Sequence, residues 1–451
     1  MWDTLGFSQS PYDARPLGPV SEDEELLVNR QEESIEICTT LDSLQEGFVV
    51  LSGPPGVGKT SFFNVQQFRL ATEKAEFGPK LLPNYRLCSI YPGDAPKTIA
   101  LRALENLVRS VQQNCTQEGV SLPSGTAKIS KWLNSKGNSG FDIGLDILGF
   151  GGSFGRSVEL PGVESISFEG LQDAIECVVS EVVGKLKFDG AFLALDNIEN
   201  LENLELKRLL ITFRDTLFSI SRVWWVLIGQ SGLGSLIQSL DKRVSDRLTG
   251  TGLELLPLSF DELESAIGLR VKKFSKSSDA LSPLPTNIHK LLYDASHGEI
   301  RFVFKYSHEI CTKFVESIRK AVMTSFEGGK DEKSQLYIQM ADRIAKALIN
   351  RQIPAKRAES LLKDIVKQEF DRLDLQPETK KMLGKLAKKG EARSRDFEEF
   401  DCSSRQQFFN KYLKKLHSQG LLSKRQQGSA VFYQLRGLGA IAFKLKLVDS
   451  N

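Results

Sequence analysis

The chain has 451 residues, of which 41% are hydrophobic and 26% charged, the proportions of an ordinary folded protein with room for two to four domains. No apolar run approaches the roughly 18 residues of a membrane span, so we expect no membrane partner. The six cysteines and four histidines lie far apart, which argues against a disulfide framework or a zinc site. The N-terminus lacks a secretory pattern, so we expect a cytoplasmic protein, nucleoid-associated or, in a eukaryote, nuclear.

Positive charge is concentrated at one end of the chain. Residues 376–451 hold 16 Lys and Arg against seven Asp and Glu, which is +9, so the overall net charge of +2 leaves −7 for residues 1–375. A basic C-terminal module on an acidic body indicates an anionic partner for that module.

Short apolar runs alternate with helical patterns through the first half of the chain. Wholly apolar runs are typical of strands covered on both faces of a parallel sheet, so the alternation predicts a three-layer α/β domain. The strands are expected at residues 48–51, 87–91, 191–195, 223–228 and 253–258. The helices are expected at residues 35–44, from 59 onward, at 96–114 and at 168–187.

Residues 139–163 interrupt this pattern. Alternate residues are apolar from Phe141 to Ile147 and again from Val158 to Leu160, with glycines between the two runs. This arrangement predicts an inserted β-hairpin with a flexible tip.

The second half of the chain is helical up to residue 374, with a loop expected at 326–335. After Pro377 the pattern predicts helices at residues 378–389, 394–400 and 403–419, followed by a β-hairpin that turns at Gly428 and Ser429. Helix, short helix, helix and hairpin is the order of a winged helix-turn-helix. The expected domains are therefore an α/β domain at 1–258, a helical domain at 259–374 and a winged helix at 375–451.

The stretch GPPGVGKT, residues 53–60, follows the first strand and opens a helix. It matches GxxxxGK[ST], in which glycines let backbone N–H groups surround a phosphate chain at a helix N-terminus. Lys59 would supply a point charge for the β and γ oxygens, and Thr60 a hydroxyl ligand for Mg²⁺. The residues expected to contact a nucleotide are Gly53, Pro54, Pro55, Gly56, Val57, Gly58, Lys59, Thr60 and Ser61.

The apolar run 191–195 ends in Asp196, and Glu199 follows three residues later. Asp196 would hold Mg²⁺ through its hydration shell, and Glu199 would orient or deprotonate the attacking water. The alternative is that both acids cap the following helix, because such side chains favour helix N-termini. The strand, the spacing and the acid pair together favour an ATPase that uses ATP and Mg²⁺.

Four further stretches accompany these two motifs in order: LVNRQEE at residues 27–33, IGQSGLGSLIQSLDKRVSDRL at 228–248, LPLSFDELESAIGLRV at 256–271 and GEIRFVFKY at 298–306. With them the sequence resembles the AAA+ ATPases, and in particular the origin-recognition initiator branch of archaea and eukaryotes. The resemblance implies that Arg30 lies near the adenine. It also implies that residues 259–374 form a helical lid carrying Arg301 as the sensor-2 arginine, for which a plain surface arginine is the alternative.

The resemblance also implies an arginine finger, a guanidinium that one subunit presents to the γ-phosphate held by its neighbour. Arg247 is the stronger candidate and Arg243 the second. Alternatively, both arginines are exposed and paired with Asp241 and Asp246. A finger implies a homo-oligomer, or a hetero-oligomer with related ATPase subunits.

Two features depart from the initiator pattern. Sensor 1 is usually an asparagine after the fourth strand, and its place holds Gly232 with Gln230 and Ser231 as polar neighbours, which is consistent with slow hydrolysis. The hairpin at 139–163 resembles insertions in STAND-class signalling ATPases, in AAA-like proteins of mobile elements and in phage-defence operons.

The third helix of a winged helix enters the major groove of DNA, and wing residues touch the flanking backbone. In SSRQQFFNKYLKKLHSQ, residues 403–419, the apolar side chains fall at helical spacing and are expected in the core: Phe408, Phe409, Tyr412, Leu413 and Leu416. The residues expected to face DNA are Arg405, Gln406, Lys411, Lys414, Lys415 and Gln407, with Lys424 and Arg425 on the wing. The alternative is a winged helix that contacts protein.

The leading hypothesis is a multimeric, ATP-hydrolysing AAA+ protein of initiator or loader type that binds DNA through its C-terminal module. The second is a STAND-like or defence ATPase in which ATP gates a separate effector protein. Fold alone does not decide between them.

Overall fold

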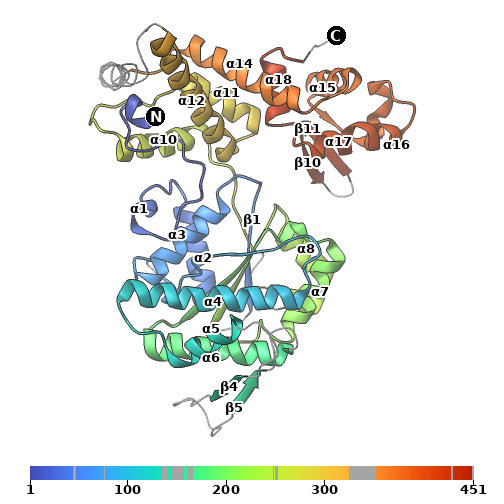
Figure 1. Cartoon of the computed structure of the whole chain (residues 1–451). Coiled ribbons are helices and arrows are strands. Elements are labelled where there is room, and N and C mark those ends of the chain that lie inside the picture. Colours follow the sequence, from blue (N-terminus) through green and yellow to red (C-terminus); the bar gives the residue numbers. More distant parts are fainter. Residues whose placement is uncertain are drawn as a thin grey trace. The chain divides into compact units, whose positions relative to one another are not determined.

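The computed structural model describes residues 1–43, 47–75, 77–134, 141–144, 157–160, 166–246, 248, 252–324, 351–427 and 430–448. The chain forms two compact units, shown in Figure 1. We call Pro16–Leu256 the core unit, and Met1–Arg15 together with Pro257–Asn451 the C-terminal unit. No helix in the described ranges is long and apolar enough to cross a membrane.

A parallel sheet forms the centre of the core unit. Its strands are β1 (Phe48–Ser52), β2 (Leu81–Leu82), β3 (Cys88–Ser89), β6 (Gly190–Asp196), β7 (Val223–Ile228) and β8 (Leu253–Glu254). They pair in the order β2-β6-β7-β1-β8, with β3 also on β6, and each of these pairings is parallel. The five expected strands are present, and β2 was not expected. In such a sheet, ligands bind beyond the carboxyl ends of the strands, where the strand order reverses.

Helices cover both faces of this sheet, because alternate residues of a strand point to opposite sides. In β6, Leu193 packs in one hydrophobic core and its neighbours Phe192 and Ala194 pack in the other. The first core includes α4 (Pro96–Glu118), α5 (Ser124–Leu133), α6 (Phe168–Leu186), α7 (Asn203–Arg214), α8 (Leu233–Leu240) and α9 (Lys242–Ser245), and the second includes α2 (Gln31–Ser43) and α3 (Lys59–Ala71). The predicted three-layer α/β fold is confirmed.

The inserted hairpin is present where its strands were expected. β4 (Phe141–Gly144) pairs antiparallel with β5 (Ser157–Leu160), so that Phe141 lies opposite Leu160. The residues expected at its tip lie outside the described ranges.

In the C-terminal unit, the described residues from 257 to 372 include the helices α10 (Phe260–Phe274), α11 (Thr286–Ser296), α12 (Ile300–Thr324) and α14 (Ala355–Arg372). Ser259 and Glu262 form a capping box that fixes the start of α10. The loop expected at 326–335 lies outside the described ranges.

The chain then follows the expected order of helices and hairpin. The elements are α15 (Pro377–Lys389), β9 (Glu391–Ala392), η3 (Ser394–Phe400), α16 (Arg405–Gln407), the π-helical η4 (Phe408–Leu413), α17 (Lys414–Ser418), β10 (Leu422–Gln427), β11 (Ala430–Leu435) and α18 (Leu438–Lys444). β11 pairs antiparallel with both β10 and β9.

The first 15 residues, which were expected in the α/β domain, pack in the C-terminal unit. Residues 1–15, which include η1 (Trp2–Leu5), belong to the C-terminal unit and not to the α/β unit that follows them in the chain. Phe7 bridges Ser275 just beyond α10. Residues from Pro16 onward, with α1 (Ser21–Glu24), belong to the core unit.

Candidate functional site

The glycine-rich loop between β1 and α3 depends on backbone angles that favour glycine. Gly53, Gly56 and Gly58 have φ values of 153°, 73° and 100°. A Cβ atom at Gly53 would lie 2.5 Å from the carbonyl oxygen of Leu255, so another residue there would force the loop away from the end of β8. A Cβ at Gly58 would meet nothing within 4 Å, and this glycine precedes α3 without a side-chain cap. The first-turn N–H groups of α3 are therefore suited to an anionic ligand.

Lys59 is the first residue of α3, and its side chain returns to the loop. Its Nζ donates to the carbonyl oxygens of Gly53 at 2.8 Å and Pro54 at 3.1 Å. Thr60 is half-buried beside it. The ammonium and the hydroxyl thus lie at the start of the helix, where the sequence placed the phosphate and Mg²⁺ ligands.

Asp196 and Glu199 lie beyond the carboxyl end of β6. Asp196 is its last residue, in register with Ile228 of β7, and Glu199 follows on the short helix η2 (Ile198–Asn200). Burial raises the pKa of Glu199, the charge of Lys59 lowers it and the charge of Asp196 raises it. Two carboxylates and an ammonium are therefore close enough to influence one another.

The alternative that these acids cap a helix does not hold for α7. α7, the next full helix, is capped by Glu202 and Glu205, and the N-cap residue of η2 is Asn197. Asp196 and Glu199 therefore lie at the end of the sheet without capping α7. Oxygen ligands of this kind are those that Mg²⁺ prefers.

Two neighbours of Glu199 were missed by the sequence reasoning. Asn200 donates from Nδ2 to the carbonyl oxygen of Ile90 at 2.8 Å and so connects η2 to the chain after β3. Gly229 follows β7, where a Cβ would lie 3.5 Å from Glu199 Oε2 and 2.6 Å from Leu233 Cδ2. A larger residue at position 229 would displace one of these side chains.

The segment proposed to hold sensor 1 lies beside the glycine-rich loop. The N–H of Gly229 donates to the carbonyl oxygen of Leu51 in β1 at 3.1 Å. Gln230 and Ser231 are exposed, and Gly232 has a φ of 81° before α8. The two polar side chains are therefore on the surface close to the end of β1.

Two of the predicted nucleotide contacts have other partners. Arg30 is 7% exposed, and its guanidinium donates to Glu33 Oε1 at 2.6 Å and to the carbonyl oxygen of Leu256 at 2.8 Å. Ser61 Oγ accepts the N–H of Leu17 at 3.0 Å. Arg30 thus connects the start of α2 to the backbone of Leu256, the last residue of the core unit. Its contact with an adenine stays a prediction.

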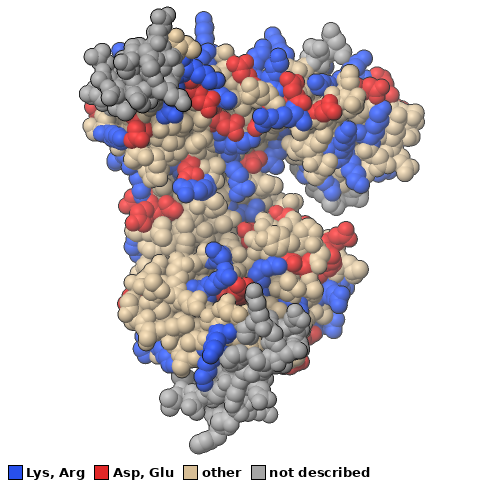
Figure 2. All heavy atoms as spheres, viewed as in Figure 1, with Lys and Arg blue, Asp and Glu red and all other residues tan. Residues whose placement is uncertain are grey.

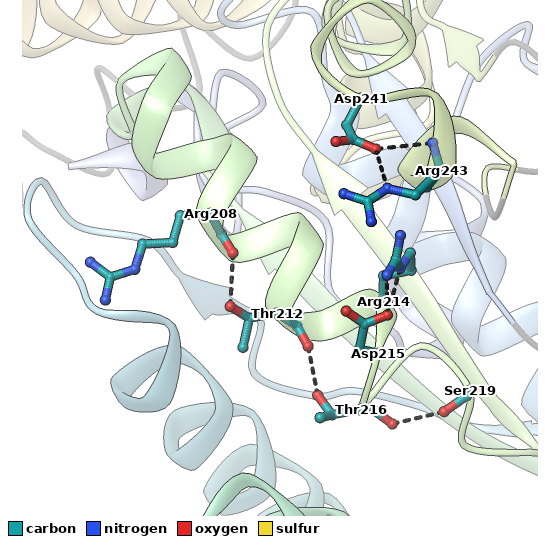
Figure 3. A network of polar contacts seen from close by, with 8 residues as sticks. All are labelled: Arg208, Thr212, Arg214, Asp215, Thr216, Ser219, Asp241 and Arg243. Atoms are coloured by element: carbon teal, nitrogen blue, oxygen red, sulfur yellow. Dashed lines mark hydrogen bonds and ion pairs between the residues drawn. The ribbon is translucent and has the colours of Figure 1, made fainter.

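The first arginine-finger candidate, Arg247, lies outside the described residues. Arg243 is described: its side chain is 67% exposed, and its N–H and Nε lie 3.0 and 3.4 Å from Asp241 Oδ1. Figure 3 shows this pair, a second pair of Arg214 with Asp215, and Arg208 extending away from both. The exposed partnership with Asp241 is the arrangement that the alternative described.

Arg301 is exposed at the second position of α12 in the C-terminal unit. Its proposed role towards the nucleotide stays a prediction.

Some of the predicted DNA-facing residues have polar partners within the protein, and others have no ion pair among the described residues. Every one of these side chains that the structure describes is exposed, and the side chain of Arg425 lies outside the described set. Arg405 Nε donates to Ser394 Oγ at 3.0 Å, and Lys411 Nζ pairs with Glu378 at 2.7 Å. Lys414, Lys415 and Lys424 have no ion pair among the described residues. Figure 2 shows basic and acidic side chains interspersed over this part of the unit. Contact of these three lysines with DNA phosphates stays a prediction.

The core of the same module is as expected. Phe408, Tyr412, Leu413 and Leu416 are buried, and Phe409 is half-buried. None of the four buried side chains is available to stack on a base.

No protein-family model matches the chain, and none of the curated proteins does. Among solved structures the chain is similar to the ORC2 protein of Aeropyrum pernix in ADPNP–ADP complexes, with 13% identity, a TM-score of 0.45 and coverage of 98% of this chain and 97% of that one. For the ORC1 protein of the same organism in complex with DNA, the identity is 14%, the TM-score is 0.42, and the match covers 97% of this chain and 96% of that one. For Cdc6p from Pyrobaculum aerophilum, the identity is 13%, the TM-score is 0.36, and the match covers 93% of this chain and 95% of that one.

Proposed function

We propose that this chain is an AAA+ protein of initiator or loader type that binds ATP with Mg²⁺, hydrolyses it, and acts as a multimer on DNA. The observation that carries the ATPase proposal is that Lys59, at the start of the helix after β1, lies close enough to Asp196 and Glu199, at the end of β6 and just after it, to influence their charge at the carboxyl edge of one parallel sheet. An ammonium, a metal-binding carboxylate and a base are the groups that phosphate-bond hydrolysis requires.

Each residue has a defined task in this proposal. The loop N–H groups and Lys59 bind the phosphate oxygens, and Thr60 and Asp196 hold Mg²⁺, directly and through water. Bound Mg²⁺ would neutralise phosphate charge. Glu199 accepts the proton of the attacking water, and burial favours this because a raised pKa makes a carboxylate a stronger base.

The DNA part of the proposal is supported by charge and exposure. Lys414, Lys415 and Lys424 are exposed cations on the third helix and the hairpin of the basic module. Exposed lysines of this kind neutralise phosphates and give affinity without base specificity.

A signalling ATPase that contacts an effector protein is the second candidate. The ion pairs of Lys385 with Asp401, Lys389 with Glu399 and Lys411 with Glu378 favour it. These pairs neutralise some of the positive charge of the C-terminal module. The resulting surface carries both basic and acidic side chains, which suits a protein partner.

The test of the ATPase proposal is Glu199→Gln, which keeps the shape of the side chain but cannot take a proton. ATP affinity should stay within about twofold of the wild type, while kcat falls at least about 100-fold. Glu202→Gln, three residues away at the cap of α7, is the matched control and should hydrolyse ATP normally. Equal kcat values for the two variants would remove Glu199 from the mechanism.

DNA binding separates the two candidate functions. The full chain should bind duplex DNA at low salt, with an affinity that falls steeply as salt rises. Lys414→Ala with Lys415→Ala should reduce the slope by about two, because each lysine would neutralise one DNA phosphate. Absence of binding at low salt favours the effector-gating alternative.

A further inference from the structure

The first 15 residues form an arm that is built into the C-terminal unit. The N–H of Ser8 donates to the carbonyl oxygen of Phe274 at 2.8 Å, and the N–H of Lys276 donates to that of Gly6 at 2.9 Å. The arm therefore pairs with the chain beyond α10 as a short antiparallel strand would.

Tyr12 anchors the arm in the interior of that unit. It is 1% exposed, and its hydroxyl lies 2.7 Å from Ser282 Oγ and 3.0 Å from His289 Nε2, and accepts the N–H of Leu284 at 3.2 Å. His289 is fully buried, and its Nδ1 lies 2.6 Å from Glu264 Oε1. Removing the hydroxyl would leave partners in this network unsatisfied, away from water.

The same segment has a second anchor, in the core unit. Ser61 Oγ accepts the N–H of Leu17 at 3.0 Å, and Asn64 Nδ2 donates to the Leu17 carbonyl oxygen at 2.8 Å. Ser61 and Asn64 lie three residues apart, on one face of the start of α3. Lys59 and Thr60 immediately precede Ser61, so the first two turns of α3 carry both the proposed phosphate ligands and the anchor of the N-terminal segment.

The connection between the anchors is short. Five residue steps separate Tyr12 from Leu17, which at full extension span about 17 Å. Pro16 stiffens the connection by fixing its φ angle. A link of this length sets an upper limit on the distance between the two anchors.

We propose that residues 12–17 are a strap that positions the first turn of α3 and couples nucleotide binding at the glycine-rich loop to docking of the arm on the C-terminal unit. This inference rests on the proposed nucleotide binding. Tyr12 is in this scheme a positioning residue that acts through Leu17. Because coupling is reciprocal, nucleotide must change the docking of the arm by the same factor by which docking changes nucleotide affinity.

The first test follows the arm by hydrogen exchange in the full-length protein, with and without Mg²⁺ and ADP or a non-hydrolysable ATP analogue. The amides of Ser8 and Lys276 report arm docking, and nucleotide should change their exchange rates at least about fivefold. Inserting three glycines between Arg15 and Pro16 keeps both anchors but lengthens the strap by about 10 Å. Nucleotide should still bind to this variant, and the change in exchange should disappear.

The second test measures nucleotide affinity. Tyr12→Phe keeps the ring and removes the hydroxyl, and should shift the nucleotide Kd at least about fivefold. Tyr306→Phe is the matched control, because Tyr306 is also buried in the C-terminal unit, with its hydroxyl bound to Glu369, but is not part of the strap. It should leave the Kd unchanged even if it destabilises the unit.

Each failure has its own signature. If the wild type binds nucleotide but the Ser8 and Lys276 amides do not respond, or respond equally in the glycine-insertion variant, the strap proposal is wrong and the nucleotide proposal stands. Equal Kd values for Tyr12→Phe and wild type also overturn the strap. If the wild type binds no nucleotide, the proposed function fails and the strap coupling fails with it.

Discussion

Glu199 shows how the end of a strand can tune one carboxyl group. Burial raises its pKa, the nearby charge of Asp196 raises it as well, and the charge of Lys59 opposes both effects. Lys59 comes from a different segment of the chain than Asp196 and Glu199, so the motif spacing predicted the residues but not the direction of the shift. The consequence is a testable pH dependence.

The rate of ATP hydrolysis should fall as pH falls through the raised pKa of Glu199. A base must be ionised to accept a proton, and a raised pKa means that protonation begins at a higher pH than the usual glutamate value of about 4.3. We expect an acid limb in the kcat profile that lies above this value. Residual hydrolysis by Glu199→Gln should lack the limb, and a limb that persists in this variant would assign it to another group.

At the scale of elements, the sequence predicted best what depends on local pattern. β1 and β7 are fully buried, and the short apolar runs that form them, alternating with helical patterns, identified them in the sequence. β2 is only two residues long, Leu81 and Leu82, and too short to give a pattern. The contacts of Arg30 with Leu256 and of Lys411 with Glu378 were missed for a different reason. The two residues of each contact are distant in sequence, so no local rule could pair them.

The start of β6 depends on a glycine for reasons of space. A Cβ at Gly190 would lie 2.1 Å from the carbonyl oxygen of Arg222 and 2.5 Å from the ring of Trp224. Gly190→Ala should therefore lower the free energy of unfolding by about 1–3 kcal/mol. Gly184→Ala is the control, because a Cβ at that exposed position in α6 meets nothing within 4 Å, and it should raise stability by about 0.5–1 kcal/mol. Urea unfolding of the two variants measures the difference, and equal stabilities would contradict the packing argument.

In the basic module, an acid on the first helix pairs with a lysine on the third. Glu378 of α15 pairs with Lys411 across an exposed surface. Glu378→Gln should release Lys411 and remove a negative charge, raising affinity for duplex DNA several-fold at low salt, with the gain shrinking as salt screens it. Glu359→Gln, an exposed position on α14, removes the same charge elsewhere and should have a smaller effect. Equal effects of the two variants would mean that only net charge matters.

At the scale of the whole molecule, the chain passes between the two units twice, once after Arg15 and once after Leu256. The expected division had a single passage between the α/β and helical domains, near residue 258. The first passage could not be predicted because the arm is held by residues some 270 positions away, such as Phe274 and His289, and the turn-rich arm sequence has no periodicity that points to them. Non-local pairing of this kind appears only in the folded chain.

Assembly is the property that a single chain reveals least, and Arg247 is the residue through which we expect to detect it. The residue follows α9 in a charged segment where Arg243 is already held by Asp241. If Arg247 serves a neighbouring subunit, Arg247→Ala should bind ATP normally but lose the rise in specific activity with protein concentration. Mixing it with Lys59→Ala, which cannot hydrolyse ATP but still presents Arg247, should restore part of the rate, because intact sites then face intact arginines. Arg243→Ala is the matched control and should keep the concentration dependence. Normal hydrolysis by Arg247→Ala at high protein concentration, or no recovery on mixing, would show that the arginine acts within its own subunit or not at all.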